Sequence, residues 1–283
     1  MSGTLQLPRP TWFVGCGNMG GAILEGWRAG GLDLSAVSVI RPSGQPIAGV
    51  RVVRSALEIG GARPQMALLA FKPQMLQELA SSLRPYFGPE TVVVSILAGV
   101  EVSTLRSHFP EARGIIRAMP NLPVAVRRGI TGLYGDAGEG PLRQQIADLF
   151  AALGFAMWMA DEKRLSALGS VAGAGTAYVA RFIAALAKAA VKRGLTQEIA
   201  STLALETVLG TAWMAVTGAE SMDGIAKRVA SPGGTTEAGL AVLDHDDVLD
   251  QLVALAIDAS SSRGAELAKE ARGASVSETE PLT

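Results

Sequence analysis

The sequence predicts an α/β domain built on a doubly wound sheet, followed by an all-helical domain. Between residues 12 and 160, short apolar runs of strand length alternate with amphipathic helical segments, as in sheets whose parallel strands are joined by helices. From Asp161 onward the strand pattern disappears and long helical segments replace it. We therefore expect a sheet domain at residues 1–160, a helical domain at 161–273 and a frayed tail at 274–283.

Composition and charge narrow the class of protein. At 283 residues the chain exceeds one typical domain, and its net charge of -1 gives no reason to expect nucleic acid or an anionic membrane as a partner. The single cysteine, Cys16, excludes an internal disulfide and fits a reducing compartment. Residues 1–10 lack a secretory pattern, so we expect a cytoplasmic protein. The longest uncharged run in the helical half, 165–180, is shorter than the roughly 20 residues of a membrane span.

A glycine-rich turn follows the first apolar run. Gly15, Gly17 and Gly20 have the spacing G-x-G-x-x-G, directly before an amphipathic helical segment. In that context Gly15 permits a tight turn, Gly17 lets a pyrophosphate approach the backbone and Gly20 lets the helix pack on the strand. An ordinary glycine-rich turn is the alternative. We favour a Rossmann-type dinucleotide site, with the phosphates at the helix N-terminus, formed by Gly15, Cys16, Gly17, Asn18, Met19 and Gly20.

The second apolar run, Val37–Ile40, indicates which dinucleotide is bound. NAD-binding units usually carry an acidic residue about 20 residues after the glycines, where it binds the ribose hydroxyls. Here that position holds Ile40, and Arg41 and Ser43 follow. Arg41 can pair with a 2′-phosphate and Ser43 can donate a hydrogen bond to it. A solvated arginine in a turn is the alternative, but the missing acid favours NADPH, with NADH as a weaker substitute.

Further apolar runs are predicted to be strands, and the ends of three of them lie at the ligand-binding edge of the sheet. Met66–Phe71 leads into Lys72 and Pro73, and Pro73 is suited to begin the helix predicted over 74–83. The other two runs are 91–96, which opens into Leu97-Ala98-Gly99, and 115–120, which stops at Pro120 and is followed by Asn121. Asn121 is interpreted as a polar group at the mouth of the crevice, with a turn residue as the alternative. Val50–Val53 is an additional strand candidate.

The second half of the chain is predicted to be helical. Gly194 and Gly218 are the expected helix stops. Long apolar stripes indicate burial against a second subunit, and the small residues of 172–177 permit close approach of a helix or a ligand. The predicted helices are 177–193, 197–216, 222–229 and 247–271.

The segment 229–240 departs from this helical pattern. Two glycines lie between a helix end and a helix start, so the unpaired N–H groups of Gly234, Thr235 and Thr236 would form an anion pocket at the new helix N-terminus. A simple capped turn explains Ser231 or Thr235, but not the whole run. We expect a substrate carboxylate to bind here.

Taken together, these motifs resemble the pyrroline-5-carboxylate reductase family over nearly the whole chain. The resemblance implies NADPH-dependent reduction of 1-pyrroline-5-carboxylate to L-proline, by a homodimer or larger assembly built through the helical domains. It places the Thr236 hydroxyl near the imine nitrogen as the catalytic contact, with Gly234 and Thr235 also holding the substrate and no metal. The motifs that carry it are 15–20, 72–73, 95–100, 117–121, 231–236 and 238–240. The residues that it assigns to the cofactor are Ala70, Phe71, Lys72, Pro73, Ile96, Leu97 and Ala98.

The chain departs from the family pattern on the substrate side. The family's Ser-Gly-Ser-Gly-Pro-Ala-Tyr stretch stands here as Ala172-Gly173-Ala174-Gly175-Thr176-Ala177-Tyr178, and Leu122 replaces a threonine. A reductase of another cyclic imino acid, such as a six-membered one, is therefore an alternative. A nucleotide-sensing protein without turnover is a second alternative. The intact Thr235-Thr236 pair argues against it. A hydroxyacid dehydrogenase would need a proton donor, commonly a lysine on the first long helix, and residues 165–186 contain no lysine.

Overall fold

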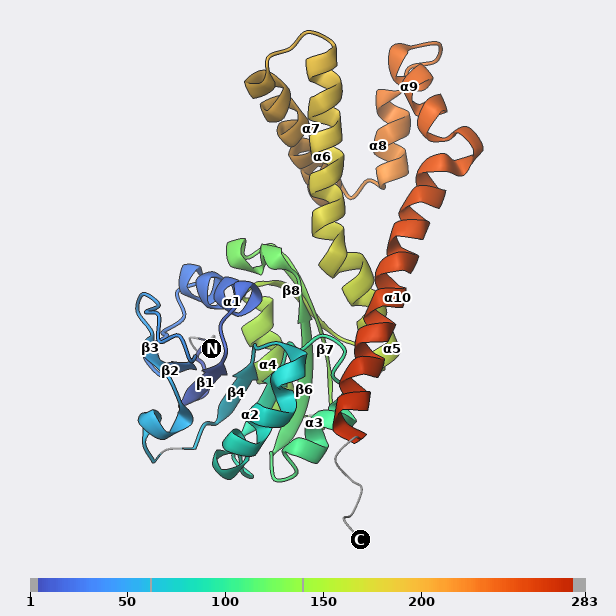
Figure 1. The fold of residues 1–283 in the computed structure, drawn as a ribbon. Coiled ribbons are helices and arrows are strands. Elements are labelled where there is room, and N and C mark those ends of the chain that lie inside the picture. Colours follow the sequence, from blue (N-terminus) through green and yellow to red (C-terminus); the bar gives the residue numbers. More distant parts are fainter. Residues whose placement is uncertain (1–4, 62, 139, 277–283) are drawn as a thin grey trace. The chain divides into compact units, whose positions relative to one another are not determined.

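The computed structural model describes residues 5–61, 63–138 and 140–276. It divides into two compact units (Figure 1). One contains the chain up to Ala174 together with the segment from Ser260 onward, and the other is Gly175–Ala259.

The first unit is built on an eight-stranded sheet with the order β3-β2-β1-β4-β5-β6-β7-β8 (Figure 1). The order reverses between β1 and β4, which is the switch point at which open α/β sheets bind ligands. The predicted doubly wound sheet is therefore confirmed. The strands are β1 (Thr11–Val14), β2 (Val37–Ile40), β3 (Arg51–Val53), β4 (Met66–Leu69), β5 (Val92–Ser95), β6 (Gly114–Pro120), β7 (Gly129–Gly135) and β8 (Gly154–Trp158).

The last two strands, β7 and β8, run against the other six. β7 pairs antiparallel with β6, whereas every other neighbouring pair is parallel. Residues 121–128 separate the two strands and hold only the short 3₁₀ helix η4 (Leu122–Val126). A parallel return needs a crossover of a dozen or more residues, so this connection is too short for one. The chain therefore turns back directly after Asn121.

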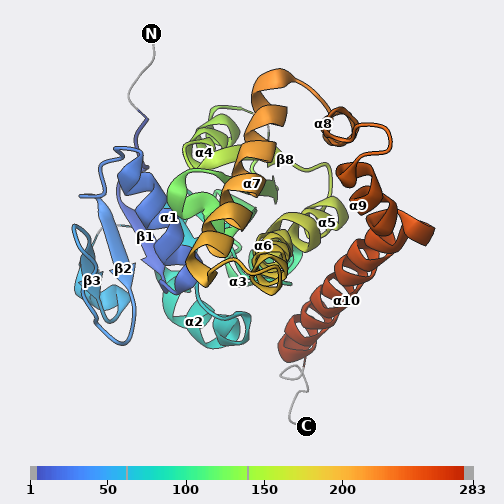
Figure 2. The ribbon, with the colours of Figure 1, turned by 90° about the horizontal axis from the view of Figure 1, so that it is seen from above.

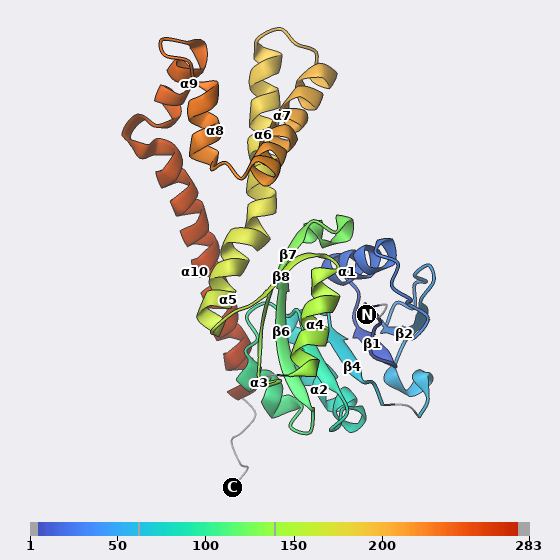
Figure 3. The same ribbon diagram turned by 180° about the vertical axis from the view of Figure 1, so that it is seen from behind.

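Helices cover both faces of the sheet (Figure 3). On one face α1 (Asn18–Ala29) and α4 (Pro141–Ala151) share a buried cluster with Phe13 of β1. On the other, α2 (Leu76–Leu83) and α3 (Val102–His108) pack with Trp12 and Val14. Because successive strand side chains point to opposite faces, one strand supplies both layers. The predicted helix at 74–83 begins as a 3₁₀ turn, η2 (Pro73–Met75), before α2.

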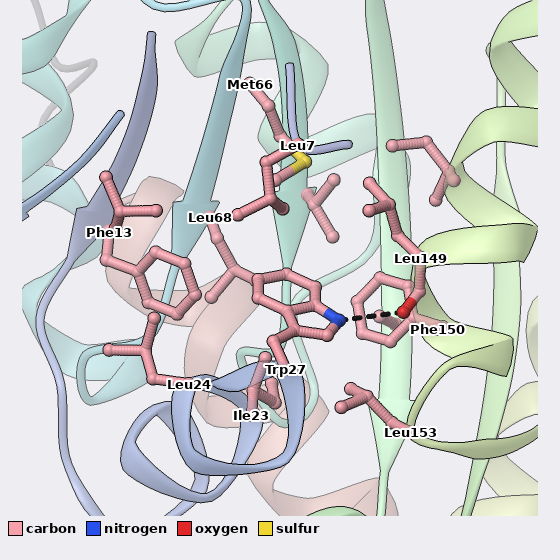
Figure 4. Close-up of a cluster of buried hydrophobic side chains, with 14 of the residues drawn as sticks. Leu7, Phe13, Ile23, Leu24, Trp27, Met66, Leu68, Leu149, Phe150 and Leu153 are labelled. Atoms are coloured by element: carbon pink, nitrogen blue, oxygen red, sulfur yellow. Dashed lines mark hydrogen bonds between the residues drawn. The ribbon is translucent and has the colours of Figure 1, made fainter. Parts of the chain in front are cut away.

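Trp27 of α1 is the centre of the first cluster (Figure 4). Its side chain is fully buried, and its Nε1–H donates to the carbonyl oxygen of Leu149 at 2.7 Å. Its ring meets Phe13 edge-on, with 5.8 Å between centroids, and Phe150 at 6.1 Å. Because a buried indole N–H needs an acceptor, this bond fixes α1 against α4 and so fixes the glycine turn that precedes α1.

A buried ion pair joins the last part of the sheet to the following helix. Arg117 of β6 is 4% exposed, and its guanidinium donates to a carboxylate oxygen of Glu162 at 2.7 Å. Glu162 begins α5 (Glu162–Leu168), and the same oxygen accepts from the backbone N–H of Val102 at 3.0 Å. The contacts of Arg117 are therefore structural. Between α5 and the next helix lies one π-helical turn, η5 (Gly169–Gly173).

The second unit is helical. Its helices include α6 (Ala174–Lys192) and α7 (Gln197–Gly218), which bury Ala187, Ala200 and Ala204 where they pack together (Figures 1 and 2). α8 (Met222–Val229) and α9 (Thr235–Leu243) follow, and the 3₁₀ helix η6 (His245–Asp247) leads into α10 (Val248–Val276), which continues past Ala259 into the first unit. Tyr178 of α6 donates to the carbonyl oxygen of Ala256 of α10 at 3.1 Å.

The predicted helix ends are correct in part. Gly194 has a φ of +96° and ends α6 as expected. Gly218 is instead the last residue of α7, and the left-handed position is taken by Ala219, with a φ of +50°. The tail predicted at 274–283 begins inside α10, and its residues 277–283 lie outside the described part of the chain.

The helices carry many exposed apolar side chains. Phe182 is 51% exposed on α6 and Leu209 is 56% exposed on α7. By length and composition alone, two helical stretches, Glu162–Lys192 and Gln197–Gly218, could cross a membrane. The first is longer than the uncharged run suggested, because α5, η5 and α6 are continuous and the stretch includes Arg181.

Candidate active site

A cavity of about 600 Å³ lies at the carboxyl ends of β1, β2 and β4, at the switch point of the sheet. Its volume is in the range of small-molecule and cofactor sites. Among the residues that the structure describes, no aspartate or glutamate lines it, whereas three cationic side chains do. The lining is Val14, Gly15, Cys16, Gly17, Asn18, Met19, Gly20, Ile40, Arg41, Pro42, Arg54, Ala70, Phe71, Lys72, Met75, Leu79 and Ile96.

The glycine turn has the backbone geometry that the motif predicts. Gly15 has a φ of +79°, and its N–H donates to the carbonyl oxygen of Ile40 at 2.8 Å. A Cβ at Gly15 would lie 2.6 Å from the carbonyl oxygen of Ala70, so no other residue fits without displacement of the backbone. A Cβ at Gly20 would lie 3.1 Å from the Cβ of Ala70, which shows how closely α1 approaches β4. Gly17 has open space around its Cα, where a phosphate could approach.

The first turn of α1 is left uncapped. Gly17 is the N-cap residue and supplies no side chain, and the first intrahelical bond runs from the N–H of Gly21 to the oxygen of Gly17. The amides of Asn18, Met19 and Gly20 therefore precede the helical ladder. No acidic side chain lies in this turn to neutralise the helix dipole. The turn is an anion site by geometry and by charge.

Arg41 leaves the sheet directly after β2 and is held in place by its neighbours. Its Nε donates to the hydroxyl oxygen of Ser43 at 2.9 Å, and its Nη2 donates to the side-chain oxygen of Gln45 at 2.9 Å. Ser43 itself does not line the cavity. It orients the guanidinium, which is a different contribution from the phosphate contact that the sequence suggested.

Burial raises the pKa of the Cys16 thiol, and the nearby charge of Arg41 opposes that shift. Only the thiolate is nucleophilic, so alkylation by iodoacetamide at neutral pH should be slower than for free cysteine and should accelerate with pH. Because Cys16 lines the cavity, NADPH should protect it, and the alkylated protein should lose NADPH binding. Mass spectrometry of the alkylated peptide with and without NADPH measures this. Reaction as fast as free cysteine, or no protection, would contradict it, and Cys16→Ala is the control.

Some predicted cofactor residues are not on the cavity wall: besides Ser43, they are Pro73, Leu97, Ala98 and Asn121. Leu97 is buried in the core beneath β5, and Pro73 begins η2. Ala98 is exposed in the turn after β5, next to Gly99, at which a Cβ would lie 2.9 Å from the backbone nitrogen of Ala268 in α10. This turn therefore packs against α10.

Asn121 uses both ends of its amide within the protein. Its oxygen accepts from the N–H of Ile130 at 2.7 Å, and its nitrogen donates to the carbonyl oxygen of Ala172 at 3.1 Å. The side chain is buried, with 7% of the residue exposed. This geometry favours the turn-residue interpretation over the crevice contact, because Asn121 fixes the start of β7 and the π-helical turn η5.

The sequence did not indicate Arg54 or some of the apolar residues of the wall, such as Met75 and Leu79. Arg54 follows β3, which is the neighbour of β2, so adjacency of the two strands could have indicated it. Met75 and Leu79 lie four residues apart on the helical segment after β4 and are half-buried. Such side chains are indistinguishable from core residues in a sequence, which is why they were not identified.

The loop before α9 has a geometry that parallels the first turn of α1. Gly233 has a φ of +71°, Gly234 is the N-cap without a side chain, and the first intrahelical bond runs from Ala238 to Gly234. The amides of Thr235 and Thr236 therefore precede the helical ladder.

Two of this loop's own amides are already bonded. The N–H of Gly234 donates to the carbonyl oxygen of Ser231 at 2.9 Å, which corrects the expectation that this amide is unpaired. The N–H of Gly233 donates to the carboxylate of Glu237 at 2.7 Å. The turn closes on itself through these bonds, so the anion-binding amides expected here reduce to those of Thr235 and Thr236. Thr236 is half-buried and Thr235 is exposed.

The altered small-residue stretch lies at η5 and the start of α6. Ala172 is inside the π-helical turn, a conformation that is frequent at functional sites. Gly173 and Gly175 have no neighbouring atom within 4 Å of the position that a Cβ would take. The described residues of the chain therefore leave space open at both glycines.

Two family models match the chain. Residues 162–267 match the model described as pyrroline-5-carboxylate reductase dimerisation, and residues 12–99 match the model described as NADP oxidoreductase, coenzyme F420-dependent. The pyrroline-5-carboxylate reductase of Pseudomonas aeruginosa is 35% identical over 265 residues, which are 91% of this chain and 96% of that protein.

Solved structures share the fold. A pyrroline-5-carboxylate reductase from Coxiella burnetii has a TM-score of 0.81 at 29% identity and covers 92% of this chain and 99% of its own. The Plasmodium falciparum pyrroline carboxylate reductase, solved with NADP bound, has a TM-score of 0.83 at 24% identity, over 94% of this chain and 100% of its own. At that identity the second likeness concerns the fold alone.

Proposed function

Because the chain belongs to the pyrroline-5-carboxylate reductase family, we propose that it reduces 1-pyrroline-5-carboxylate to L-proline at the expense of NADPH. It is thus an oxidoreductase acting on a C=N bond. The observation that carries this proposal is the cavity at the Gly15–Gly20 turn, whose cationic wall suits a dinucleotide, in a chain that matches such a reductase along nearly its whole length.

The residues of the cavity fit NADPH. The uncapped amides of Asn18, Met19 and Gly20 would hold the diphosphate, and Arg41 would hold the 2′-phosphate. NAD-preferring sites place an acid at the end of the second strand, where this chain has Ile40 and Arg41. When bound, NADPH supplies a hydride from carbon 4 of its nicotinamide ring. Tight binding of NADH is not expected, since Arg41 would then face no phosphate.

Thr235 and Thr236 are proposed to bind the imino acid. Their amides would hold its carboxylate, and the hydroxyl of Thr236 would lie near the ring nitrogen as the catalytic contact. A protonated imine is already an electrophile, so the protein needs to orient it rather than supply a strong acid. Orientation alone can provide effective molarities of about 10⁵ M or more.

We further propose a cytoplasmic homodimer or larger assembly, without nucleic acid or membrane as a partner. Both apolar stretches that could by composition cross a membrane lie entirely within the region that matches the dimerisation model. Burial against a second subunit would cover side chains such as Phe182 and Leu209, which are half exposed in the single chain.

A panel of five- and six-membered cyclic imino acids, assayed with NADPH and NADH, tests the function. We expect the highest kcat/KM with 1-pyrroline-5-carboxylate and NADPH, measured as the loss of reduced-nicotinamide absorbance. A preference for a six-membered ring would show that Ala172, Ala174 and Thr176 mark a different reductase. NADPH binding without oxidation of the cofactor by any imine would indicate a nucleotide sensor.

A further inference from the structure

Arg54 lies beside Arg41 because of the register of two strands. In the β2–β3 pair, Ile40 is opposite Val53, so the next residues, Arg41 and Arg54, leave adjacent parallel strands at the same edge. The N–H of Arg41 donates to the carbonyl oxygen of Val53 at 2.9 Å and ties the two strand ends together. Both arginines line the cavity that begins at the glycine turn.

The Arg54 guanidinium lies across the turn that follows Arg41. Gly44, in this turn, has a φ of +62°, and a Cβ there would lie 2.9 Å from Nε and 3.5 Å from Nη2 of Arg54. The turn is closed by a bond from the N–H of Gly44 to the carbonyl oxygen of Arg41 at 3.0 Å. The absence of a side chain at Gly44 is what lets the Arg54 side chain lie along this turn.

The charges of Arg41 and Arg54 are not compensated within the described part of the chain, where neither guanidinium forms an ion pair with a carboxylate. The carboxylate of Glu58 instead accepts from the backbone N–H of Arg54 at 3.3 Å and from the hydroxyl of Ser55 at 3.5 Å. Arg51, the first residue of β3, differs, because its guanidinium donates to the backbone carbonyl oxygens of Glu58 and Ile59.

We propose that Arg54 is a second residue that selects NADPH, and that it binds the 2′-phosphate from the side opposite Arg41. Two like charges converging on one cavity edge repel each other unless an anion lies between them, and a phosphate dianion can accept hydrogen bonds from both guanidinium groups. This inference rests on the proposed function only for the identity of the cavity as the NADPH site. It concerns cofactor binding and not the imino acid.

Fragment binding isolates this contact. Two ligands are titrated into the full-length protein by calorimetry. One, 2′,5′-ADP, has the 2′-phosphate, and the other, 5′-ADP, lacks it. Arg54→Gln should lower the affinity for 2′,5′-ADP by about 10- to 100-fold, as expected for the loss of a charged hydrogen-bond donor. Its affinity for 5′-ADP should change by less than about twofold. Arg54→Lys keeps the charge and should lose less affinity for 2′,5′-ADP than Arg54→Gln does. Arg51→Gln, which removes an arginine from β3 but not from the cavity wall, should leave both affinities unchanged.

Three results would overturn the inference. The first two are an unchanged affinity of Arg54→Gln for 2′,5′-ADP and an equal loss of affinity for both ligands. The third is a selective loss of affinity for 2′,5′-ADP in Arg51→Gln as well, because any positive charge on or next to β3 would then have the same effect. Retained binding of 5′-ADP shows that the variant is folded. Since no imino acid is present in this experiment, failure of the reductase assignment would leave the result intact, and failure of the Arg54 contact would leave the reductase assignment intact.

Discussion

Arg41→Asp is expected to raise the KM for NADPH by about 100-fold or more while it changes the KM for NADH by less than about threefold. The substitution removes a charged donor, worth a factor of about 10 to 100, and adds repulsion between a carboxylate and the 2′-phosphate. The structure strengthens the expectation, because Ser43 and Gln45 hold the guanidinium in one orientation and no acid lines the described cavity wall.

Steady-state kinetics with both cofactors at saturating imino acid measure this change. Arg41→Gln separates the two causes, since it removes the donor without introducing a negative charge and should give the smaller increase. Equal increases in KM for NADPH and NADH would show that Arg41 does not contact the 2′-phosphate. Arg41 would then be a residue that maintains the 41–45 turn.

Thr236→Ala is expected to lower kcat/KM for 1-pyrroline-5-carboxylate by the equivalent of about 1–3 kcal/mol, or about 5- to 150-fold. The variant keeps the backbone amide that the helix start offers to the carboxylate and removes only the hydroxyl proposed to contact the imine nitrogen. A partner lost from a buried polar contact accounts for this magnitude. NADPH affinity should be unchanged, because the cofactor's phosphates are proposed to bind the turn before α1.

The comparison with Thr236→Ser gives this experiment its control. Serine restores the hydroxyl at the same position and should recover most of kcat/KM. If the threonine methyl acted only by filling space, serine would not restore kcat/KM. Unchanged kinetics in Thr236→Ala would discard Thr236 as the catalytic contact. The hydroxyl of Thr235 would then be the remaining candidate for this contact in the loop.

The sheet could be predicted from sequence because its signals are local. Runs such as Met66–Leu69 are buried on both faces and therefore uniformly apolar, and Gly15 is required by a positive φ and by the nearby Ala70 carbonyl. The antiparallel β7 depends on the length of one connection, which is visible in a sequence only after both strand ends are known.

What the sequence did not reveal depends on contacts between distant residues. Asn121 could be a ligand contact or a turn residue until its bonds to Ile130 and Ala172 are seen. Gly234 was expected to have a free amide because nothing in the motif shows that Ser231 accepts its proton. Arg54 was missed because its relation to Arg41 follows from strand pairing and not from spacing along the chain.

A crystal structure with NADP⁺ and L-proline bound together would locate both proposed sites in one experiment. We expect the diphosphate to contact the amides at the start of α1, after Gly17. We expect the proline carboxylate to contact the amides of Thr235 and Thr236, with the Thr236 hydroxyl at the ring nitrogen. A diphosphate bound away from the glycine turn, or a proline bound away from the start of α9, would contradict this expectation.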